Sequence, residues 1–291
     1  MTARCVVVGY AGVDFKFATE PFGGPGHTTI VRHSLHGAGV LPGAAAYFAL
    51  GLAGNGVSVD LVSWVGDDEN GTLFVEHHRR AGVNVEGVSR TGTRSPVTHM
   101  FWPDEGEPVV FFDPGDVDQT LTEVQRELLA TAPAVLVGVG PETATAAALD
   151  VIPDDALVMW AVKRDPLSVP PDLAAALAAR ADVICHSEAE TDFLNDICGL
   201  DLDALAAAGT LVVETRGARG AALRTDYRQT VVAAPRPVAV EDTTGAGDTF
   251  AAGLMARLPH RTDLAAIDLE AAVLAACADA HALLQARTNE R

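Results

Sequence analysis

The sequence predicts an α/β fold, in which a doubly wound, mostly parallel sheet has helices on both faces and a small β lid beside it. Short β-branched runs alternate with alanine- and leucine-rich stretches along most of the 291 residues, as expected for repeated strand–helix units. Strand runs such as 135–139 also lack polar residues, which a strand buried on both faces requires. No repeat, linker or low-complexity tract divides the chain, so we expect a single domain over residues 1–291.

The expected strands are short apolar runs, and the expected helices are the longer stretches between them. Strands are expected at Cys5–Tyr10, Val59–Val65, Ala134–Val139, Leu157–Val162, Asp182–His186 and Leu211–Glu214. Helices are expected at Gly43–Ala53, Thr72–Ala81, Leu121–Thr131, Pro171–Arg180 and Glu188–Asn195. Loops that follow such strands lie at the edge of the sheet where α/β proteins bind ligands.

Two segments, at about residues 14–38 and 90–116, break this alternation. They carry glycines, prolines and short strand-like pieces such as Val97–Trp102 and Val109–Phe112. Neither can be a crossover helix, so we expect both to leave the main sheet and to pair as the small β lid.

The lid segments contain four aromatic residues whose role the sequence leaves open. They are Phe101, Trp102, Phe111 and Phe112. Either these rings face a ligand or a partner subunit, or they pack the lid against the main body.

The lid should move when a ligand binds, with Gly37 and Gly39 as the expected hinges because glycine tolerates the backbone change.

Composition excludes several classes of partner. Acidic residues number 39 against 20 basic ones, which gives a net charge of −19 and repels nucleic acid and anionic membranes. No apolar run approaches the roughly 20 residues that span a bilayer, and no secretory signal is evident. The four cysteines show no metal-binding spacing. We therefore expect a cytoplasmic protein that acts on a small molecule.

One glycine-rich segment has the features of a phosphate-binding loop. Asp242-Thr-Thr-Gly-Ala-Gly-Asp-Thr-Phe250 leads into a helix on which Phe250, Leu254 and Leu258 share one face. Its small residues leave the backbone open, and the first turn of the helix presents N–H groups and the positive end of the helix dipole. A Walker A loop is absent, because neither lysine of the chain follows a glycine.

Asp248 lies in the first turn of that helix. An acid is favoured there by the helix dipole in any protein. Beside an anion-binding loop, however, its carboxylate could also take a proton from an attacking hydroxyl. The residues alone thus favour a role of Asp248 as a proton acceptor without establishing it.

These residues resemble the ribokinase (PfkB) family of carbohydrate kinases. The segment 242–250 is similar to the family's C-terminal signature. The N-terminal signature is resembled by Pro42-Gly43, Ala49 and Gly51, followed by Val65-Gly-Asp-Asp-x-x-Gly71 and Arg80-Ala-Gly-Val83. Thr215-Arg-Gly-Ala-Arg-Gly220 resembles the loop along the nucleotide, and the lid resembles the family's lid over the sugar. The resemblance implies a ribokinase-like fold.

The resemblance also implies a role for each matching residue. Asp248 is implied as the general base, and Gly245, Ala246 and Gly247 as the anion hole for the γ-phosphate. Thr215, Gly217 and Gly220 are implied to line the ATP site, and Asp14, Gly43 and Tyr47 the substrate pocket. Glu190 is implied to help bind Mg²⁺ through water, and Asp242 and Thr244 match positions that hold a monovalent cation in some members.

The chain departs from the family pattern at two of these places. The family's N-x-x-E motif is Ser187-Glu-Ala-Glu190 here, which also fits a helix-capping box; we expect Glu190 to serve both roles. Tyr47 stands where ribokinases have an asparagine, and it either offers its flat face to a sugar or base or packs inward from its helix. Lys163 and Asp165 are set aside as a surface ion pair.

Together these features predict an ATP-dependent kinase that phosphorylates a hydroxyl of a small sugar, with ATP and Mg²⁺ as cofactors and K⁺ as a weaker expectation. A nucleoside kinase of the same fold is one alternative, and a catalytically idle sugar- or nucleotide-binding protein is another. The resemblance also implies a homodimer formed through the lid.

Overall fold

Nine strands of the described chain form one central sheet in the computed structural model of this protein. The structure describes residues 2–35, 41–104, 108–226, 228–235, 238, 242–258, 264 and 267–289. The strand order is β14-β13-β12-β11-β10-β9-β1-β5-β6. Neighbouring strands run parallel from β6 to β12, while β13 and β14 add antiparallel pairs at one edge. The predicted fold class is confirmed.

The strands lie close to their predicted places. The main sheet contains β1 (Arg4–Val8), β5 (Ser58–Val65), β6 (Val88–Arg90), β9 (Ala134–Val137), β10 (Leu157–Ala161), β11 (Val183–Ser187), β12 (Leu211–Thr215), β13 (Ala221–Thr225) and β14 (Arg228–Val232). Its central strands are almost completely buried, which explains why their sequences lack polar residues. The sequence did not predict β6, β13 or β14.

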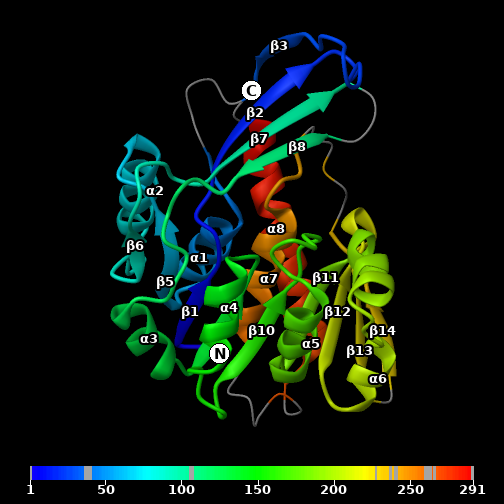
Figure 1. The fold of residues 1–291 in the computed structure, drawn as a ribbon. Coiled ribbons are helices and arrows are strands. Elements are labelled where there is room, and N and C mark those ends of the chain that lie inside the picture. The colour runs from blue at the N-terminus through cyan, green and yellow to red at the C-terminus, as the bar shows by residue number, and fades with distance from the viewer. Residues whose placement is uncertain are drawn as a thin grey trace.

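Helices cover both faces of the sheet. One face carries α1 (Ala44–Gly54), α2 (Glu69–Arg80), α7 (Ala246–Arg257) and α8 (Leu269–Asn289), and the other α3 (Glu123–Ala130), α4 (Glu142–Leu149), α5 (Pro171–Arg180) and α6 (Leu202–Ala207). Figure 1 shows α4 and α5 in front of the strands and α7 and α8 behind them. Alternate residues of β1 enter the two cores, Cys5 and Val7 on one side and Val6 and Val8 on the other.

The helix predicted at Glu188–Asn195 is wrong in type. The chain forms a 3₁₀ turn, η1 (Glu188–Glu190), and then a π-helical turn, η2 (Phe193–Ile197). The backbone N–H of Ser187 donates to the Glu190 carboxylate at 2.7 Å, which tightens the first turn. The N–H of Cys198 donates to the Phe193 carbonyl at 2.9 Å, which widens the last one. The sequence also did not predict α4, α6 and the full length of α8.

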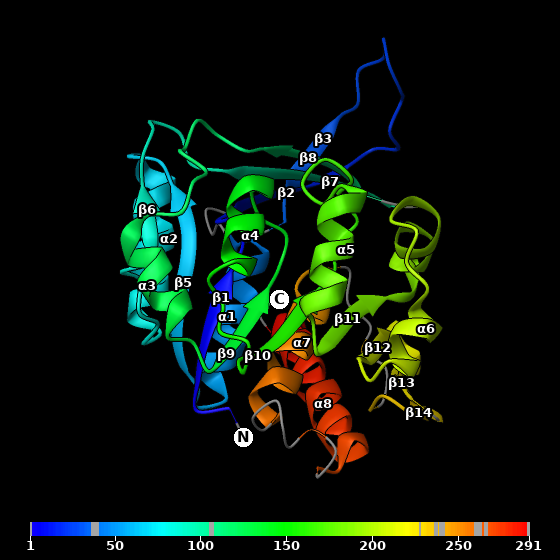
Figure 2. The ribbon, with the colours of Figure 1, turned by 60° about the horizontal axis from the view of Figure 1, so that its bottom comes forward.

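A second, smaller sheet forms from the two segments that broke the alternation, with one short strand, β4, from just beyond the first of them. It contains β2 (Val13–Thr19), β3 (Val31–Ser34), β4 (Leu41–Pro42), β7 (Val97–Pro103) and β8 (Val109–Asp113), in the order β3-β2-β7-β8 with β4 on β2. Figure 2 shows this lid sheet across one end of the main sheet. The chain passes from β1 directly into β2, so the lid lies at the carboxyl ends of the parallel strands. The expected hinges Gly37 and Gly39 lie outside the described residues.

The long helix α8 is part of this fold. By length and composition alone, Leu269–Arg287 is apolar enough to cross a membrane, contrary to the expectation from the sequence. Its polar side chains are used within the protein: Asp279 binds Arg257 of α7 at 2.6 Å, and Arg287 donates to the carbonyl of Asp242 at 2.9 Å. We therefore assign α8 as a packing helix of the α/β domain.

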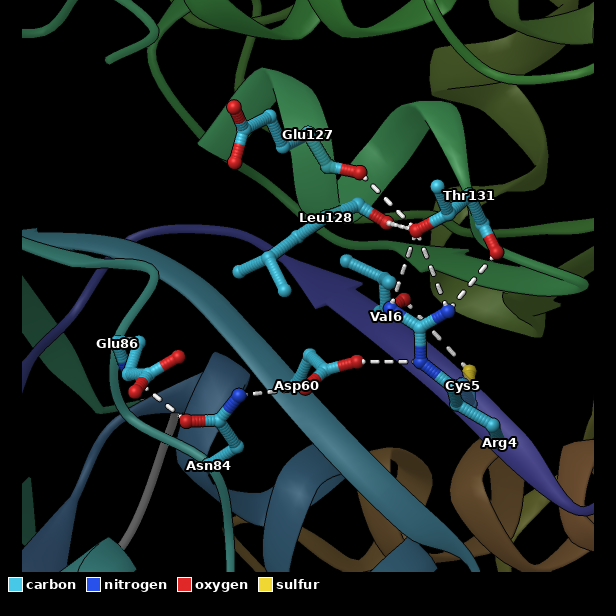
Figure 3. A network of polar contacts seen from close by, with 9 residues as sticks. All are labelled: Arg4, Cys5, Val6, Asp60, Asn84, Glu86, Glu127, Leu128 and Thr131. Carbon is cyan, nitrogen blue, oxygen red and sulfur yellow. Dashed lines mark hydrogen bonds and ion pairs between the residues drawn. The ribbon is translucent and has the colours of Figure 1, made fainter. Parts of the chain in front are cut away.

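Polar contacts fasten the opposite end of the sheet (Figure 3). The Arg4 guanidinium donates to the Asp60 carboxylate at 2.7 Å and to the carbonyl of Thr131 at 2.8 Å, after α3. The Asn84 amide donates to the other oxygen of Asp60 at 2.7 Å. These bonds join β1, β5 and α3 at the amino ends of the strands, so this end has a structural role.

Candidate active site

The predicted phosphate-binding loop stands at the amino end of α7. Gly245 is the N-cap residue with φ of 79°, and α7 begins at Ala246. Only glycine adopts this left-handed conformation at little cost. The backbone therefore turns sharply at 245, where the N–H of Ala246 donates to the carbonyl of Thr243 at 3.2 Å, and the helix dipole at this end favours an anion.

The ring of Tyr47 supports this turn from α1. A Cβ atom placed on Gly245 would lie 2.7 Å from two carbons of that ring, so glycine is also required there by close packing. Tyr47 is only 8% exposed, and its hydroxyl accepts a hydrogen bond from Arg287 at 3.2 Å. This agrees with the inward-packing alternative. Tyr47 thus contacts Gly245 of the predicted phosphate-binding loop, and its contact with substrate stays a prediction.

Asp248 is the acidic residue in the first turn of α7. Burial raises the pKa of its carboxyl group to about 6, and the negative charges of Glu190 and Asp14 also raise it, while the positive charge of Lys163 acts in the opposite direction. A carboxylate tuned to this range can accept a proton at neutral pH and hold it better than an ordinary aspartate. The charges that act on Asp248 thus come from the lid strand β2, from η1 and from the segment that follows β10.

The inner face of the lid brings Asp14 and Lys16 to the site. They are two residues apart on β2, so their side chains point to the same side, and both are almost fully buried. Burial raises the pKa of Asp14 to about 6, against the lowering effects of Lys16 and a hydrogen bond with Thr98. Asp14 is thus a buried acceptor where the sequence predicted contact with substrate hydroxyls.

Asp242 begins the loop and is bonded to several parts of the chain. Its carboxylate accepts hydrogen bonds from the Lys16 ammonium and from the backbone N–H of Thr244, each at 2.9 Å. Burial opposes ionisation of this carboxyl group, but the charge of Lys16 and these hydrogen bonds hold its pKa well below the usual value. The carboxylate therefore stays charged and fixes the start of the loop.

The expected nucleotide residues lie at the end of β12 and in the turn that follows it, which contains η3 (Gly217–Arg219). Thr215 pairs with Ser187 of β11, so the segment 215–220 adjoins η1. Gly217 and Gly220 have φ of 56° and 93°, and a Cβ on Gly220 would lie 2.0 Å from the carbonyl oxygen of Val232. Both glycines are thus required to shape the turn.

Glu190 has the helix-capping contacts that the sequence predicted. Its carboxylate accepts hydrogen bonds from the backbone N–H of Ser187 at 2.7 Å and from the Ser187 hydroxyl at 2.9 Å. Its charge also raises the pKa of Asp248. Glu190 therefore caps η1 and lies close enough to Asp248 for electrostatic coupling.

Gly43, expected in the substrate pocket, is the N-cap residue of α1. Its N–H donates to the carbonyl of Gly12, and a Cβ atom on Gly43 would lie 3.2 Å from the Gly12 Cα. This close approach holds the start of α1 against the chain just before β2. Gly43 thus shapes the backbone beside Asp14.

Three basic residues at the site were missed or set aside. Lys16 could have been found from its two-residue spacing to Asp14 on a strand, whereas Arg287 carries no local signal because it is 45 positions from Asp242. Lys163 was assigned to a surface ion pair with Asp165. Asp165 instead accepts hydrogen bonds from the N–H groups of Leu167 and Ser168, and the charge of Lys163 acts on Asp248 and Asp14.

Residues 2–288 match the pfkB family of carbohydrate kinases. The chain belongs to this family, whose members transfer a phosphoryl group to a hydroxyl of their substrate. The family and the enzyme class predicted from the sequence are thereby confirmed.

Two curated relatives act on different sugars. An ATP-dependent ribose-1-phosphate kinase from Halopiger xanaduensis is 32% identical over 222 residues, which are 74% of this chain and 72% of the relative. A fructokinase from Rhizobium leguminosarum bv. trifolii is 27% identical over 243 residues, 74% of this chain and 71% of the relative.

Solved structures of kinases share the fold. The nucleoside kinase of Methanocaldococcus jannaschii has a TM-score of 0.77 at 19% identity, with 96% of this chain and 90% of that chain covered. Arabidopsis thaliana ribokinase, complexed with ribose and ATP, has a TM-score of 0.75 at 20% identity, with 96% and 92% covered.

Proposed function

We propose that this kinase uses ATP to phosphorylate a hydroxyl of a small sugar, with Asp248 as general base. The observation that carries the proposal is the place of Asp248, partly buried in the first turn of α7 beside the N–H groups of 245–247. The acceptor hydroxyl gives its proton to Asp248 as its oxygen attacks the γ-phosphorus. The bond from that phosphorus to the β,γ-bridging oxygen breaks, and ADP leaves.

The anion hole supplies the electrostatic part of this reaction. Backbone N–H groups of Gly245, Ala246 and Gly247 would face the oxygens of the transferring phosphoryl group, where charge is stabilised by fixed donors at no cost of reorganisation. Lys163 extends the positive potential on the side of Asp248. Thr215, Gly217 and Gly220 would hold the rest of the ATP.

Magnesium fits this arrangement through Glu190. Within the described residues, no three carboxylate, histidine or cysteine side chains converge to hold a metal, so phosphate oxygens and water would supply the remaining ligands. When bound, Mg²⁺ neutralises charge on the phosphates of ATP. A monovalent cation at Asp242 and Thr244 is a weaker expectation than Mg²⁺, because positively charged side chains already lie beside the Asp242 carboxylate.

Glu190→Gln separates the capping role from the metal role. Glutamine keeps an acceptor for Ser187 but loses the charge, so we expect the thermal midpoint to change little and the Mg²⁺ concentration for half-maximal activity to rise by about tenfold or more. Thermal denaturation and a Mg²⁺ titration of ADP release measure the two effects. A lower midpoint with an unchanged Mg²⁺ requirement would leave Glu190 as a cap alone.

The substrate is proposed from the inner lid face. Asp14 offers a buried acceptor for hydroxyls, and Phe112 lies 5.0 Å from the ring of Tyr10, just after β1. This pair offers an apolar surface to a sugar ring, and equally to the base of a nucleoside. Release of ADP across a panel of sugars, sugar 1-phosphates and nucleosides decides between the sugar kinase and the nucleoside kinase. An idle binding protein would release none with any of them.

The outer lid face supports the proposed homodimer. Phe17, Phe101 and Phe111 form a row of rings with centroids 5.4 and 6.0 Å apart, and Phe111 is 54% exposed. Rows of exposed aromatic residues mark interfaces.

The free cysteines and the acidic composition support a cytoplasmic location and a small-molecule substrate.

Phe111→Glu should convert the dimer to a monomer, because a charge placed in the apolar interface loses its water. Sedimentation velocity over a range of protein concentrations measures the change. Val124→Glu, on the exposed face of α3, is the control and should remain dimeric. A wild-type protein that is monomeric at all concentrations would refute the dimer.

A further inference from the structure

The carboxylate and the main-chain carbonyl of Asp242 are both held by cationic side chains. Lys16, from lid strand β2, donates to one carboxylate oxygen at 2.9 Å. Arg287, near the end of α8, donates to the carbonyl at 2.9 Å and has a nitrogen 3.6 Å from the same carboxylate oxygen. The Lys16 side chain is 0% exposed, and those of Asp242 and Arg287 are 9% and 12% exposed.

A diffusible monovalent cation fits this environment poorly. Lys16 and Arg287 already balance the negative charges of Asp242 and Asp14, so a further cation would gain no uncompensated negative charge in this buried region. The second oxygen of the carboxylate accepts the N–H of Thr244. The oxygens of Asp242, the acidic residue that the resemblance assigns to a cation, are thus engaged by the chain itself.

The same contacts determine the shape of the anion hole. The bond from Thr244 to Asp242 sets the turn that leads to Gly245. Arg287 also donates to the hydroxyl of Tyr47, whose ring packs against Gly245. The lid strand, α1 and α8 therefore meet at the loop through Lys16, Tyr47 and Arg287.

We infer that Lys16 and Arg287 supply, as fixed charges, the positive charge for which some family members use a monovalent cation, and that both are positioning residues for the anion hole. The inference deepens the proposed function and rests on it for the activity measurements. It replaces the expectation of a K⁺ site at Asp242 and Thr244.

The first test uses the wild-type enzyme. Its kcat with the best sugar should differ by less than about twofold between potassium chloride and choline chloride at equal ionic strength of about 0.1 M, where exposed charges are screened alike. Its thermal midpoint should also be the same in both salts. Activation by K⁺ of about tenfold or more would overturn the inference.

The second test removes one fixed charge. Lys16→Met keeps the length of the side chain and leaves Asp242 short of one cation. In choline chloride its kcat should fall by about 10- to 100-fold, the effect of a displaced anion hole. Potassium chloride should restore part of the lost activity and raise the thermal midpoint, because a cation that binds only the folded state stabilises it. Arg80→Met, which removes an exposed charge from α2, should match the wild type.

A Lys16→Met enzyme that responds to K⁺ no more than the wild type does would overturn the inference. If that variant does not fold, Arg287→Gln is judged by the same criterion. Failure of the proposed function is distinguishable, because a protein without activity on any substrate still reports through its thermal midpoint. In that case, a rise in the thermal midpoint of the Lys16→Met variant with K⁺ supports the inference that Lys16 takes the place of a cation. An unchanged thermal midpoint refutes it.

Discussion

Replacing Asp248 with asparagine should lower kcat by about 10²- to 10⁴-fold, the usual contribution of a general base. Asparagine has nearly the same shape but cannot accept the proton of the substrate hydroxyl. ATP binding should persist, because the anion-hole N–H groups belong to the backbone. The fold should also persist, since the substitution removes a carboxylate whose charged form is disfavoured by burial. Steady-state kinetics and ATP titration measure these effects.

The matched control is Asp172→Asn, which makes the same change at an exposed acid in the first turn of α5. It tests whether loss of a first-turn charge alone alters activity, and it should leave kcat unchanged. If Asp248→Asn keeps kcat within tenfold of the wild type, the base is a different residue.

The same carboxylate should control the pH profile. A general base works when deprotonated, so kcat/KM should be flat above the pKa of Asp248 and fall about tenfold per pH unit below it. Burial raises this pKa from 3.8 to about 6, which moves the fall about two pH units upward from that of an ordinary aspartate. Asp14, whose pKa is also about 6, would steepen the fall if its ionised form binds the sugar.

The sequence predicted the parts of the proposed site whose chemistry is local. The loop, the proposed base and the helix that carries it lie within 242–258, and the capping box of Ser187 and Glu190 lies within four positions. The buried parallel strands were likewise predicted, because each lacks polar residues along its own length. The edge strand β14, in contrast, is mostly exposed, and no apolar run marks it.

The parts that depend on tertiary folding could not be predicted. Arg287 and Tyr47 are 240 positions apart and Lys16 and Asp242 are 226 apart, so no spacing relates them. Lys163 was assigned to its sequence neighbour Asp165, although its charge acts on the carboxyl group of Asp248. Tyr47 was ambiguous because an aromatic residue on a helix can face a ligand or the core, and its packing against Gly245 depends on a residue almost 200 positions away.

Gly245→Ala should have the second large effect, through the shape of the anion hole. Alanine at φ of 79° costs about 1 kcal/mol or more in the left-handed conformation. Its Cβ atom would also lie 2.7 Å from the Tyr47 ring, so the ring or the loop must move. A displaced set of N–H donors should lower kcat by about 10²- to 10³-fold, the cost of losing a donor to the developing charge.

Gly56→Ala separates backbone strain from the packing against Tyr47. Gly56 has the same φ of 79°, and a Cβ atom there meets nothing within 4 Å. It lies between α1 and β5, at the amino end of that strand and thus opposite the site. Both variants should lose stability from the left-handed alanine, but only Gly245→Ala should lose activity and show the larger fall in thermal midpoint. Equal midpoints and equal kcat values for the two variants would mean that the loop tolerates a side chain at 245, and the anion hole would then have to be built from other groups.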